Sequence, residues 1–379
     1  MAAVVAALLL STVGSGTAAA KETTGDPRRL QAALDELRDL GAAGAQGQVS
    51  AGRRETAARS GVADLASGAP MPVAGAFRIG SDTKTFVSVV VLQLAGERRL
   101  SLDDSVERWL PGTVAGNGND GRRVTVRQLL QHTSGIANYT GDMAALGSQE
   151  GFLAHRFDHY EPAELVALAM RHRPAFEPGT HWDYSNTNYV LAGMVVKAVT
   201  GQSWAEQVHR RIVGPLGMRG TFFPGDRAAL PGRAARSYQQ FAPGGDLVDV
   251  TEFNATAADA AGGLVSTTAD LNRFWRALQD GRLLRPAQQA ELHRTVLAET
   301  YQDVRRGLRY GLGIFEVPTA CGRYWGHPGD VPGTSTFNGV DDAGRTAVVV
   351  YRTTGLADPV KGGAMDARVM RLVDDVMCG

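Results

Sequence analysis

Apolar and polar residues alternate along the chain in a way that predicts strands near both ends and helices in between. Near the N-terminus, Leu30, Ala33, Leu34 and Leu37 fall on one side of a predicted helix over residues 27–40. Short extended stretches are predicted after that helix, at 47–51, 55–63 and 77–79. The N-terminal part of the chain therefore supplies one helix and several strands.

The segment 81–94 is ambiguous between a strand and a buried helix. Its run of valines favours a strand by propensity, whereas its length favours a helix that is buried on most sides. We choose a helix. From residue 100 to about 257 the pattern predicts helices joined by loops rich in Pro and Gly. These include helices over 162–170 and over 203–213, the second ending at Gly214-Pro215.

The C-terminal third returns to strands. After Gly262-Gly263 a helix is predicted over about 268–278, and the last helix is predicted over about 365–376. Between them the pattern predicts strands at 310–317, 322–325, 334–339 and 347–352. Strands at both ends with a helical middle predict an α/β (α+β) fold, in which a mixed antiparallel sheet is built from both termini. Helices flank this sheet, and an all-α insertion forms a second lobe.

Composition and charge narrow the function classes. Hydrophobic residues make up 44% of the 379 residues, and 39 basic side chains balance 39 acidic ones. This balance argues against nucleic acid or an acidic membrane surface as a partner. The first twenty residues are apolar and end in Ala18-Ala19-Ala20, although no Lys or Arg precedes the apolar run. We interpret residues 1–26 as a signal peptide and linker of a secreted protein. The alternative is a disordered or helical N-terminus on a cytosolic protein. No other stretch is long and apolar enough to anchor the chain in a bilayer.

A candidate nucleophile opens the helix predicted over 81–94. Ser81 and Lys84 are three residues apart, and side chains at that spacing share one face of a helix. A Ser hydroxyl needs a base to become a good nucleophile, and a desolvated Lys with a lowered pKa can serve. The alternative is a surface Ser and Lys on an ordinary helix, which the apolar run after Lys84 makes less attractive.

Two further motifs carry chemistry. In the loop before residue 186, Tyr184 can pass a proton between nucleophile and leaving group, and Asn186 can hold a substrate carbonyl and Lys84. The alternative is a structural Tyr in a loop. After the predicted strand at 322–325 comes His327-Pro328-Gly329, where Gly329 permits close approach of backbone to ligand. The backbone N–H groups of Asp330 and Ser81 can together form an oxyanion hole. The alternative is a turn at a strand end that contains a His.

The three motifs in this order resemble the family of class C β-lactamases and D-alanyl-D-alanine carboxypeptidases. Further stretches that match the family pattern are Phe77-Arg78-Ile79-Gly80, Leu102-Asp103-Asp104-Ser105-Val106, Leu129-Leu130-Gln131-His132-Thr133-Ser134-Gly135, Gly201-Gln202-Ser203, Pro215-Leu216-Gly217-Met218 and Gly262-Gly263-Leu264-Val265-Ser266. The resemblance covers about residues 28–378 and implies one hydrolase domain over 27–379. Within it, an α/β lobe spans about 27–95 and 258–379, and a helical lobe spans about 96–257.

The resemblance implies an acyl-enzyme at Ser81, with Lys84 as base and Tyr184 as proton relay. Asn186, His327, Gly329 and Asp330 would bind substrate. The expected activity is that of a D-alanyl-D-alanine carboxypeptidase acting on peptidoglycan peptides. The alternatives are an esterase, a β-lactamase or a penicillin-binding receptor with slow turnover. The expected partners are therefore a small peptide, ester or β-lactam, and we expect a monomer without a cofactor.

Two departures from the family pattern bear on the substrate. Pro328 replaces the hydroxyl residue that is common between His and Gly, and Asp330 stands where a Thr or Ser often helps to hold a substrate carboxylate. An acidic side chain there would repel a carboxylate unless it turns away. These departures place both β-lactam turnover and strict carboxypeptidase specificity in question.

The remaining candidates concern cysteine and histidine. Cys321 and Cys378 can form one disulfide in an exported protein or remain two free thiols. Family members with a His-x-Gly motif can carry a similar link, so the resemblance favours the disulfide. His155 and His159 beside Asp158 can suggest a metal site, but no further ligand lies nearby in the sequence, and we expect no metal. We interpret His132 and Asp103 as structural.

Overall fold

The computed structural model describes residues 26–232 and 234–379. Its main sheet contains nine strands within these residues, in the order β2-β1-β15-β14-β12-β11-β10-β9, with β13 pairing with β14 as well. Every neighbouring pair in this sheet is antiparallel. The strands are β1 (Gly44–Ala51), β2 (Arg54–Gly61), β9 (Val296–Leu297), β10 (Arg309–Tyr310), β11 (Phe315–Thr319), β12 (Gly322–Gly326), β13 (Gly329–Val331), β14 (Thr334–Asp341) and β15 (Thr346–Arg352).

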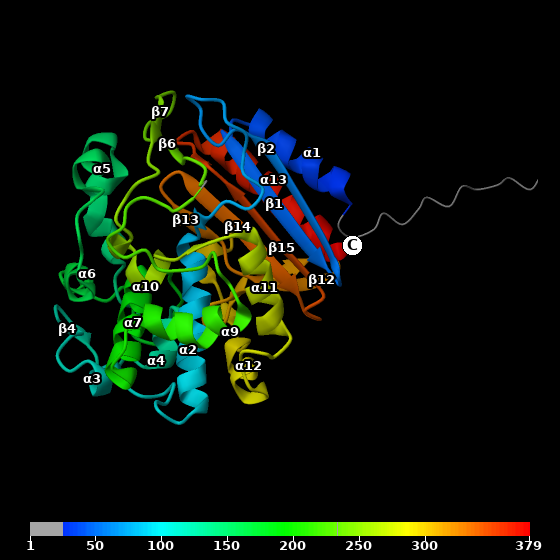
Figure 1. Cartoon of the computed structure of the whole chain (residues 1–379). Helices are drawn as coiled ribbons and strands as arrows, with labels where there is room; N and C mark the ends of the chain where they lie inside the picture. The colour runs from blue at the N-terminus through cyan, green and yellow to red at the C-terminus, as the bar shows by residue number, and fades with distance from the viewer. Residues whose placement is uncertain (1–25, 233) are drawn as a thin grey trace, which may run out of the picture.

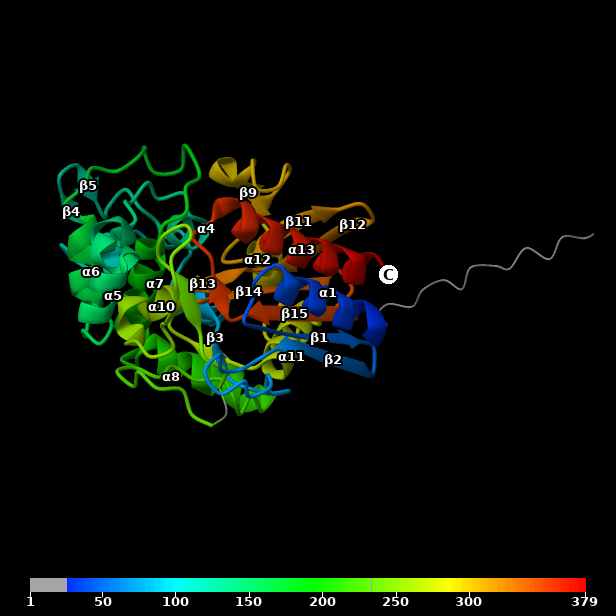
Figure 2. The same cartoon turned by 90° about the horizontal axis from the view of Figure 1, so that it is seen from above.

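Helices cover both faces of this sheet, so most residues of its central strands are buried, polar ones included. Helices α1 (Pro27–Asp39) and α13 (Pro359–Cys378) pack side by side on one face, and α11 (Thr268–Gln279) packs on the other (Figure 2). Strand β15 is accordingly buried along almost its whole length. The edge strand β2 is rich in charged residues, which blunt an open edge against pairing with another chain.

The predicted N-terminal helix is confirmed together with its buried stripe. Leu30, Ala33, Leu34 and Leu37 all face the core beneath α1. The helix begins at Pro27, and the Asp26 side chain accepts a hydrogen bond of 2.9 Å from the backbone N–H of Arg28. Proline in the first turn and a carboxylate before it are common at helix starts because the first N–H groups have no partner within the helix.

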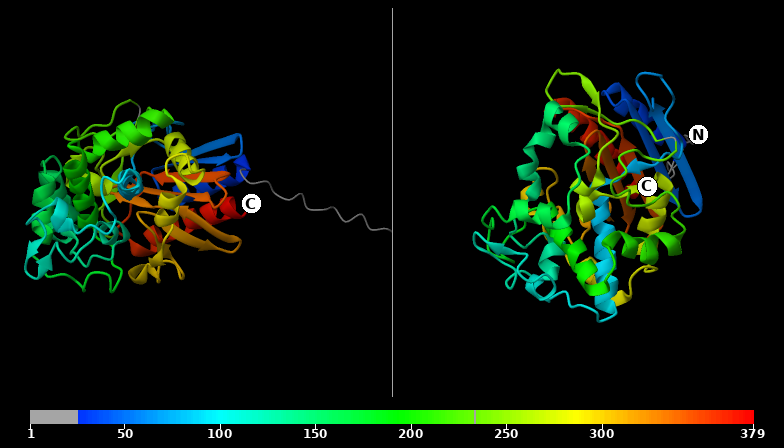
Figure 3. Two further views of the ribbon diagram at one scale, coloured as in Figure 1. Left: turned by 90° about the horizontal axis from the view of Figure 1, so that it is seen from below. Right: turned by 60° about the vertical axis from the view of Figure 1, so that its left-hand side comes forward.

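The other helices of the chain lie mostly between β2 and β9. Figure 1 shows those of residues 106–200 on one side of α2 and the main sheet on the other, and Figure 3 shows the same arrangement from two further directions. The helices between β2 and β9, apart from α11, are α2 (Thr83–Gly96), α3 (Val106–Trp109), α4 (Val126–Gln131), α5 (Gln149–His155), α6 (Pro162–Ala169), α7 (Asn186–Thr200), α8 (Trp204–Val208), α9 (Gly214–Leu216), α10 (Asp259–Gly262) and α12 (Pro286–Leu292). The remaining helical elements of the described residues are the 3₁₀ segments η1 (Gly80–Asp82), η2 (Tyr139–Gly147), η4 (Ala255–Ala257) and η5 (Glu299–Tyr301) and the π segment η3 (His209–Val213).

Short ladders complete the fold. The pairs are β3 (Phe77–Arg78) with β8 (Val265–Ser266), β4 (Ala115–Gly116) with β5 (Asn119–Asp120), and a three-stranded sheet of β16 (Thr354–Gly355), β6 (Tyr238–Gln240) and β7 (Leu247–Asp249). The predicted fold class, an antiparallel sheet assembled from both ends of the chain and flanked by helices, is confirmed. The predicted lobe boundaries stay a prediction, and the predicted signal peptide lies outside the described residues apart from Asp26.

A predicted helix and a predicted strand are altered by turns that the sequence pattern did not indicate. The helix from Trp204 does not end at Gly214-Pro215 but continues to Leu216 through the π segment η3. There the N–H of Gly214 bonds to the carbonyl of His209, five residues back, and this wider turn accommodates a proline that would clash in a regular α-helix. The predicted strand over 310–317 is two antiparallel strands, β10 and β11, because the chain turns at Gly311–Ile314.

Candidate active site

Ser81 lies at the turn where the chain passes from β3 into α2. Strand β3 is held by β8, with Phe77 opposite Ser266 and Arg78 opposite Val265. Gly80 then adopts φ +52°, a left-handed conformation that suits glycine, and η1 leads directly into α2. Ser81 is partly exposed, whereas every atom of Lys84 one turn later is shielded from solvent. The site thus has an accessible hydroxyl above a buried amine.

The Lys84 amine has three close polar neighbours. Its Nζ lies 3.0 Å from Ser81 Oγ, 2.7 Å from Asn186 Oδ1 and 2.7 Å from the Ala261 carbonyl oxygen. None of these neighbours carries a full negative charge that would stabilise an ammonium. Burial therefore lowers the pKa of Lys84 well below its usual 10.5.

The Ala261 carbonyl is presented by a strained turn. Helix α10 begins at Asp259, whose φ of +39° is unusual for a residue other than glycine. A hydrogen bond of 2.9 Å from Trp204 Nε1 to Asp259 Oδ1 holds this residue in place. The sequence motif at Gly262-Gly263 adjoins this turn, but the motif alone gave no indication that a backbone carbonyl would contact Lys84.

Tyr184 and Asn186 are positioned by the loop that enters α7. The ring of His132 lies 4.3 Å from the ring of Tyr184, and its Nδ1 accepts a hydrogen bond of 3.3 Å from the Ser185 N–H. Asn138 Oδ1 accepts from the Asn186 N–H at 3.2 Å. His132 is buried, and its burial together with the nearby Lys84 lowers its pKa well below 6.5. His132, which we interpreted as structural, thus supports the loop that carries the Tyr-x-Asn motif.

The Tyr184 ring contacts both Lys84 and a second tyrosine. Lys84 Nζ lies 4.8 Å from the Tyr184 ring centroid, and the Tyr301 ring stacks on the Tyr184 ring with centroids 5.9 Å apart and an interplanar angle of 19°. Burial raises the pKa of the Tyr184 phenol well above 10, although a hydrogen bond with Ser81 acts in the opposite direction. The phenol is therefore uncharged at neutral pH and keeps its proton available.

His327 follows β12 and is locked in one tautomer. Its Nε2 lies 3.1 Å from the Tyr310 hydroxyl, and its Nδ1 lies 2.6 Å from the Pro328 carbonyl oxygen. Because a carbonyl only accepts, Nδ1 carries the proton and Nε2 accepts from Tyr310. Burial and the nearby Lys84 lower the pKa of His327 to about 3. His327 is thus a neutral residue whose two ring nitrogens are both occupied.

Gly329 and Gly80 bring β13 against the nucleophile turn. A Cβ on Gly329 would lie 1.9 Å from the Ile79 carbonyl oxygen, and one on Gly80 would lie 2.7 Å from the Asp330 backbone nitrogen. Any larger residue would push the two segments apart. Glycine at these two positions therefore keeps the Asp330 N–H next to the turn that carries Ser81.

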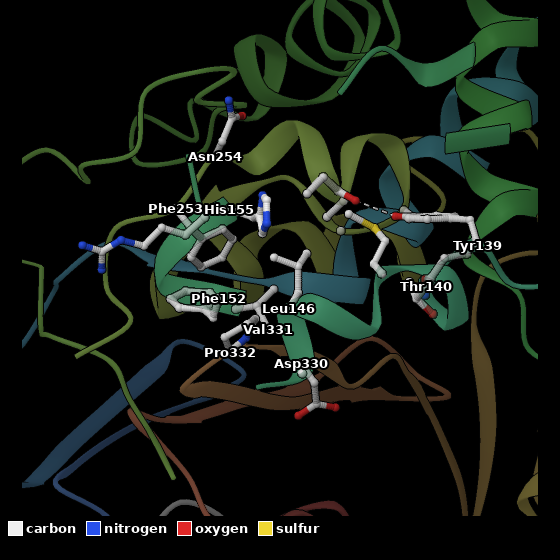
Figure 4. Close-up of a pocket in the computed structure, with 18 of the residues that line it drawn as sticks. Tyr139, Thr140, Leu146, Phe152, His155, Phe253, Asn254, Asp330, Val331 and Pro332 are labelled. Carbon is white, nitrogen blue, oxygen red and sulfur yellow. Dashed lines mark hydrogen bonds between the residues drawn. The ribbon is translucent and has the colours of Figure 1, made fainter. Parts of the chain in front are cut away.

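A largely apolar cavity of about 360 Å³ opens beside Ser81 and Asn186. Figure 4 shows the side chains of Leu146, Phe152, Phe253 and Val331 gathered within it. Asp330 also borders this cavity, but its carboxylate points away from these apolar groups (Figure 4). The wall beside the nucleophile is thus suited to an apolar group of a substrate.

Sequence reasoning missed a polar link beneath the site. Asp82, next to the nucleophile, is fully buried and accepts a hydrogen bond from Asn338 Nδ2 on β14. Asn338 Oδ1 in turn accepts from the His327 N–H at 3.3 Å. Burial raises the pKa of the Asp82 carboxyl well above 3.8. No sequence pattern indicated this link, because Asp82 and Asn338 lie far apart in the chain.

The remaining residues singled out in the sequence lie outside the group formed by Ser81, Lys84, Tyr184 and Asn186. Cys321, just before β12, and Cys378, at the end of α13, are joined by a disulfide. His155 pairs with Asp158 at 2.8 Å, whereas His159 pairs with Asp226 at 2.6 Å, so the two histidines do not converge. Among the described residues, no cluster of three or more His, Cys, Asp or Glu side chains is arranged for a metal. Within those residues, no helix combines the length and apolar character needed to cross a membrane.

Comparison with known proteins places this geometry in context. The chain is similar to a solved D-stereospecific amidohydrolase from Streptomyces sp., with 39% identity, a TM-score of 0.84 and coverage of 92% of this chain and 98% of that one. It is also similar to penicillin-binding protein 4* of Bacillus subtilis (strain 168), with 27% identity over 73% of this chain and 60% of that relative. Esterase EstB of Burkholderia gladioli is 37% identical over 48% of this chain and 46% of its own length.

The chain therefore spans only about 60% of the length of the penicillin-binding relative, whereas it matches nearly the whole of the amidohydrolase. The family model described as Beta-lactamase matches residues 30–373, which is most of the chain. With Lys84 in contact with Ser81, Asn186 and the Tyr184 ring, this chain belongs to the β-lactamase family of serine hydrolases.

Proposed function

We propose that the chain hydrolyses amide or ester bonds of D-configured amino-acid derivatives through an acyl-enzyme at Ser81. The observation that carries this proposal is the buried Lys84 amine at 3.0 Å from Ser81 Oγ. An uncharged amine has two N–H groups and one lone pair. Asn186 Oδ1 and the Ala261 carbonyl can accept the two N–H groups, which leaves the lone pair for the Ser81 hydroxyl proton.

Acylation follows from this arrangement. Lys84 takes the proton of Ser81 as the oxygen attacks the substrate carbonyl carbon and the tetrahedral intermediate forms. The Ser81 and Asp330 N–H groups stabilise the negative charge on the substrate oxygen, since Gly80 keeps the Asp330 nitrogen close to the nucleophile turn. The bond to the leaving amine or alcohol then breaks, and the leaving group departs with a proton.

Tyr184 delivers that proton in the proposed mechanism. Its phenol is uncharged because burial raises its pKa, and the residue lies close to both Ser81 and Lys84. The phenol gives its proton to the leaving group and regains one from the Lys84 ammonium, so the base is neutral again before water attacks the acyl-enzyme. His327 is a poor substitute because Tyr310 and Pro328 occupy both of its ring nitrogens.

The substrate class rests on the cavity and on the Streptomyces neighbour. The cavity lining includes Phe152, Phe253, Met143 and Leu146, which suit an apolar side chain much larger than the methyl group of alanine. The amidohydrolase, whose name states D-stereospecificity, matches 92% of this chain. A D-amino-acid amide or ester with a large apolar side chain is therefore the proposed substrate.

A D-alanyl-D-alanine carboxypeptidase is the second candidate. It is favoured by the His-x-Gly motif after β12 and by the similarity to penicillin-binding protein 4*. The similarity to esterase EstB keeps simple esters among the test substrates. A penicillin receptor with slow turnover would form the same acyl-enzyme but release it slowly.

The test combines active-site labelling with a substrate panel. We expect a fluorophosphonate to label the wild type and Ser67→Ala, an exposed control, but not Ser81→Ala. The panel contains the D- and L-phenylalanine amides, an acetylated D-Ala-D-Ala peptide and benzylpenicillin, with products and adducts followed by mass spectrometry. Turnover of the D-amide ahead of the other three supports the proposal. Preferred release of D-Ala favours the carboxypeptidase, and labelling that persists in Ser81→Ala contradicts the nucleophile.

We also propose that the chain is secreted and acts as a monomer. The disulfide between Cys321 and Cys378 supports the first part, because such bonds persist mainly outside the reducing cytosol. Immunodetection in the culture medium of the native host tests secretion, and finding the protein only in the cytosolic fraction contradicts it. Light scattering on the purified protein tests the monomer.

A further inference from the structure

A second cavity lies on the far side of Asp330 from the apolar one. It has a volume of about 240 Å³, and Asp330 and His327 border it from β13 and the end of β12. Its aromatic lining comprises Tyr301, Phe315, Tyr324 and Phe337. Asp330 borders both cavities, and its carboxylate turns away from the apolar groups of the first (Figure 4).

The charges around this second cavity do not cancel. Arg305 pairs with Asp374 at 2.5 Å, and Arg352 pairs with Asp366 at 2.7 Å. Each arginine is thus matched by its own acid, and none of the ion pairs found among the described residues includes Asp330. The carboxylate of Asp330 is therefore the unbalanced charge of this cavity.

The groups nearest the nucleophile do not balance it either. Lys84 is deprived of its charge by burial, and the pKa of His327 is lowered to about 3, so both are neutral at neutral pH. The pKa of Asp330 is raised above 3.8, chiefly because surrounding protein atoms desolvate the carboxyl, whereas the Ser335 hydroxyl and the Arg352 guanidinium act in the opposite direction. Because the residue is exposed, we expect it to be ionised at neutral pH.

A carboxylate beside aromatic rings is the chemistry that recognises an ammonium group. The carboxylate supplies charge attraction, and the faces of aromatic rings attract cations as well. The effect reaches the reacting atoms because the backbone of Asp330 lies against Gly80, next to Ser81. Burial raises the pKa of Tyr301 to about 12, and the nearby charge of Asp330 adds to this rise.

We infer that Asp330 makes this site selective for substrates that carry an ammonium group next to the scissile carbonyl, and that it disfavours substrates with a carboxylate there. This inference rests on the proposed function, since it names the charge of the substrate that Ser81 would cleave. A D-amino-acid amide or ester with a free α-amino group fits, with its apolar side chain in the first cavity and its ammonium beside Asp330.

The test uses three p-nitroanilides that differ only in charge. The first is D-phenylalanine p-nitroanilide, the second replaces its ammonium with a methyl group, and the third replaces it with a carboxylate. The measurements are made below pH 7, where an α-amino group is protonated. For the wild type we expect kcat/KM to fall by about tenfold or more at each step from cation to neutral to anion.

Two variants distinguish the effect of the Asp330 charge from the effect of losing any acidic side chain. Asp330→Asn should bring the three kcat/KM values to within a few-fold of one another while fluorophosphonate labelling of Ser81 persists. Asp246→Asn removes the same charge from an exposed acid that lines neither cavity, and it should leave the selectivity as in the wild type. Equal turnover of all three substrates by the wild type, or selectivity that survives in Asp330→Asn, would overturn the inference.

Failure of the proposed function would look different. If no anilide is cleaved although Ser81 is labelled, amide hydrolysis is wrong, and the same three acyl groups are then offered as p-nitrophenyl esters. A cationic preference that disappears in Asp330→Asn would support the role of Asp330 independently of amide cleavage. If the wild type shows no preference for the cationic ester, the role of Asp330 is overturned.

Discussion

Replacing Lys84 with methionine tests the centre of the proposed mechanism. Methionine keeps a long unbranched side chain but has no nitrogen to take the Ser81 proton. The change therefore removes the base from a side chain that is fully shielded from solvent, while Ser81 and Asn186 keep their backbone positions. We expect a protein that still folds but acylates very slowly.

The magnitude follows from two separate losses. General-base catalysis contributes about 10²–10⁴-fold, so kcat/KM should fall by that factor, which corresponds to about 2.7–5.4 kcal/mol of activation free energy. Asn186 Oδ1 and the Ala261 carbonyl each also lose a donor at 2.7 Å. Of the two acceptors only the Ala261 carbonyl makes a fully buried bond, and a buried acceptor without a donor costs about 1–3 kcal/mol. The free energy of unfolding should therefore fall by no more than about 3 kcal/mol, because the variant no longer buries an amine.

The assay measures kcat/KM with an activated ester and the free energy of unfolding with urea. Lys197→Met, at an exposed position of α7, is the matched control and should change neither quantity appreciably. Circular dichroism confirms the fold before rates are compared. A folded Lys84→Met variant that retains more than about a tenth of the wild-type kcat/KM would refute Lys84 as the base.

The pH dependence supplies an independent check on Lys84. Since burial lowers its pKa well below 10.5, the amine should already be a base at neutral pH, and kcat/KM should fall only as acid protonates it. The unfolded chain binds this proton up to about pH 10.5 and the folded chain does not, so the contribution of Lys84 to stability is complete above that pH and is lost as pH falls to the folded pKa. Lys84→Met should lack both trends.

Other predictions address the proton relay, the disulfide and the buried acid. Tyr184→Phe should lower kcat/KM about 10²-fold or more with an unchanged circular dichroism spectrum, and near-normal rates would exclude Tyr184 as the relay. Cys321 and Cys378 are 57 residues apart, so replacing both with serine should lower the free energy of unfolding by about 4 kcal/mol in urea titrations, and a loss below about 1 kcal/mol would contradict this. Burial raises the pKa of Asp82 in the folded chain well above its ordinary value of 3.8. Its contribution to stability is therefore complete below about pH 3.8 and is lost as the pH rises through the folded pKa. Asp82→Asn should remove this downward trend, and an unchanged pH–stability curve would show that Asp82 is not the group responsible.

Sequence alone predicted features that depend on local geometry. The stripe of Leu30, Leu34 and Leu37 predicted α1 because a helix returns to the same face every three to four residues. The same rule predicted that Ser81 and Lys84 would meet, and Nζ and Oγ are 3.0 Å apart. These relations are contained within one or two turns of chain, so the order of residues is enough to determine them.

Several local predictions failed where neighbouring turns altered the regular pattern. The π segment before Gly214-Pro215 let a helix pass a proline, and the glycines after Tyr310 split one predicted strand into two. Helix α13 begins at Pro359, earlier than predicted, because Asp358 caps its first N–H groups and outweighs the poor helix propensity of Gly362-Gly363. Strand β13 was missed because three residues are too short to show a period.

Tertiary structure alone decided what surrounds the reactive groups. The Ala261 carbonyl reaches Lys84 across 177 positions of sequence, and Asn338 reaches Asp82 across 256. It also directed the Asp330 carboxylate away from the apolar cavity (Figure 4). Such contacts depend on how the main sheet, α2 and α10 pack together. The same packing keeps water away from Lys84 and so lowers its pKa. Spacing along the chain determines which groups share a turn, whereas burial and the approach of distant segments determine what charge those groups carry.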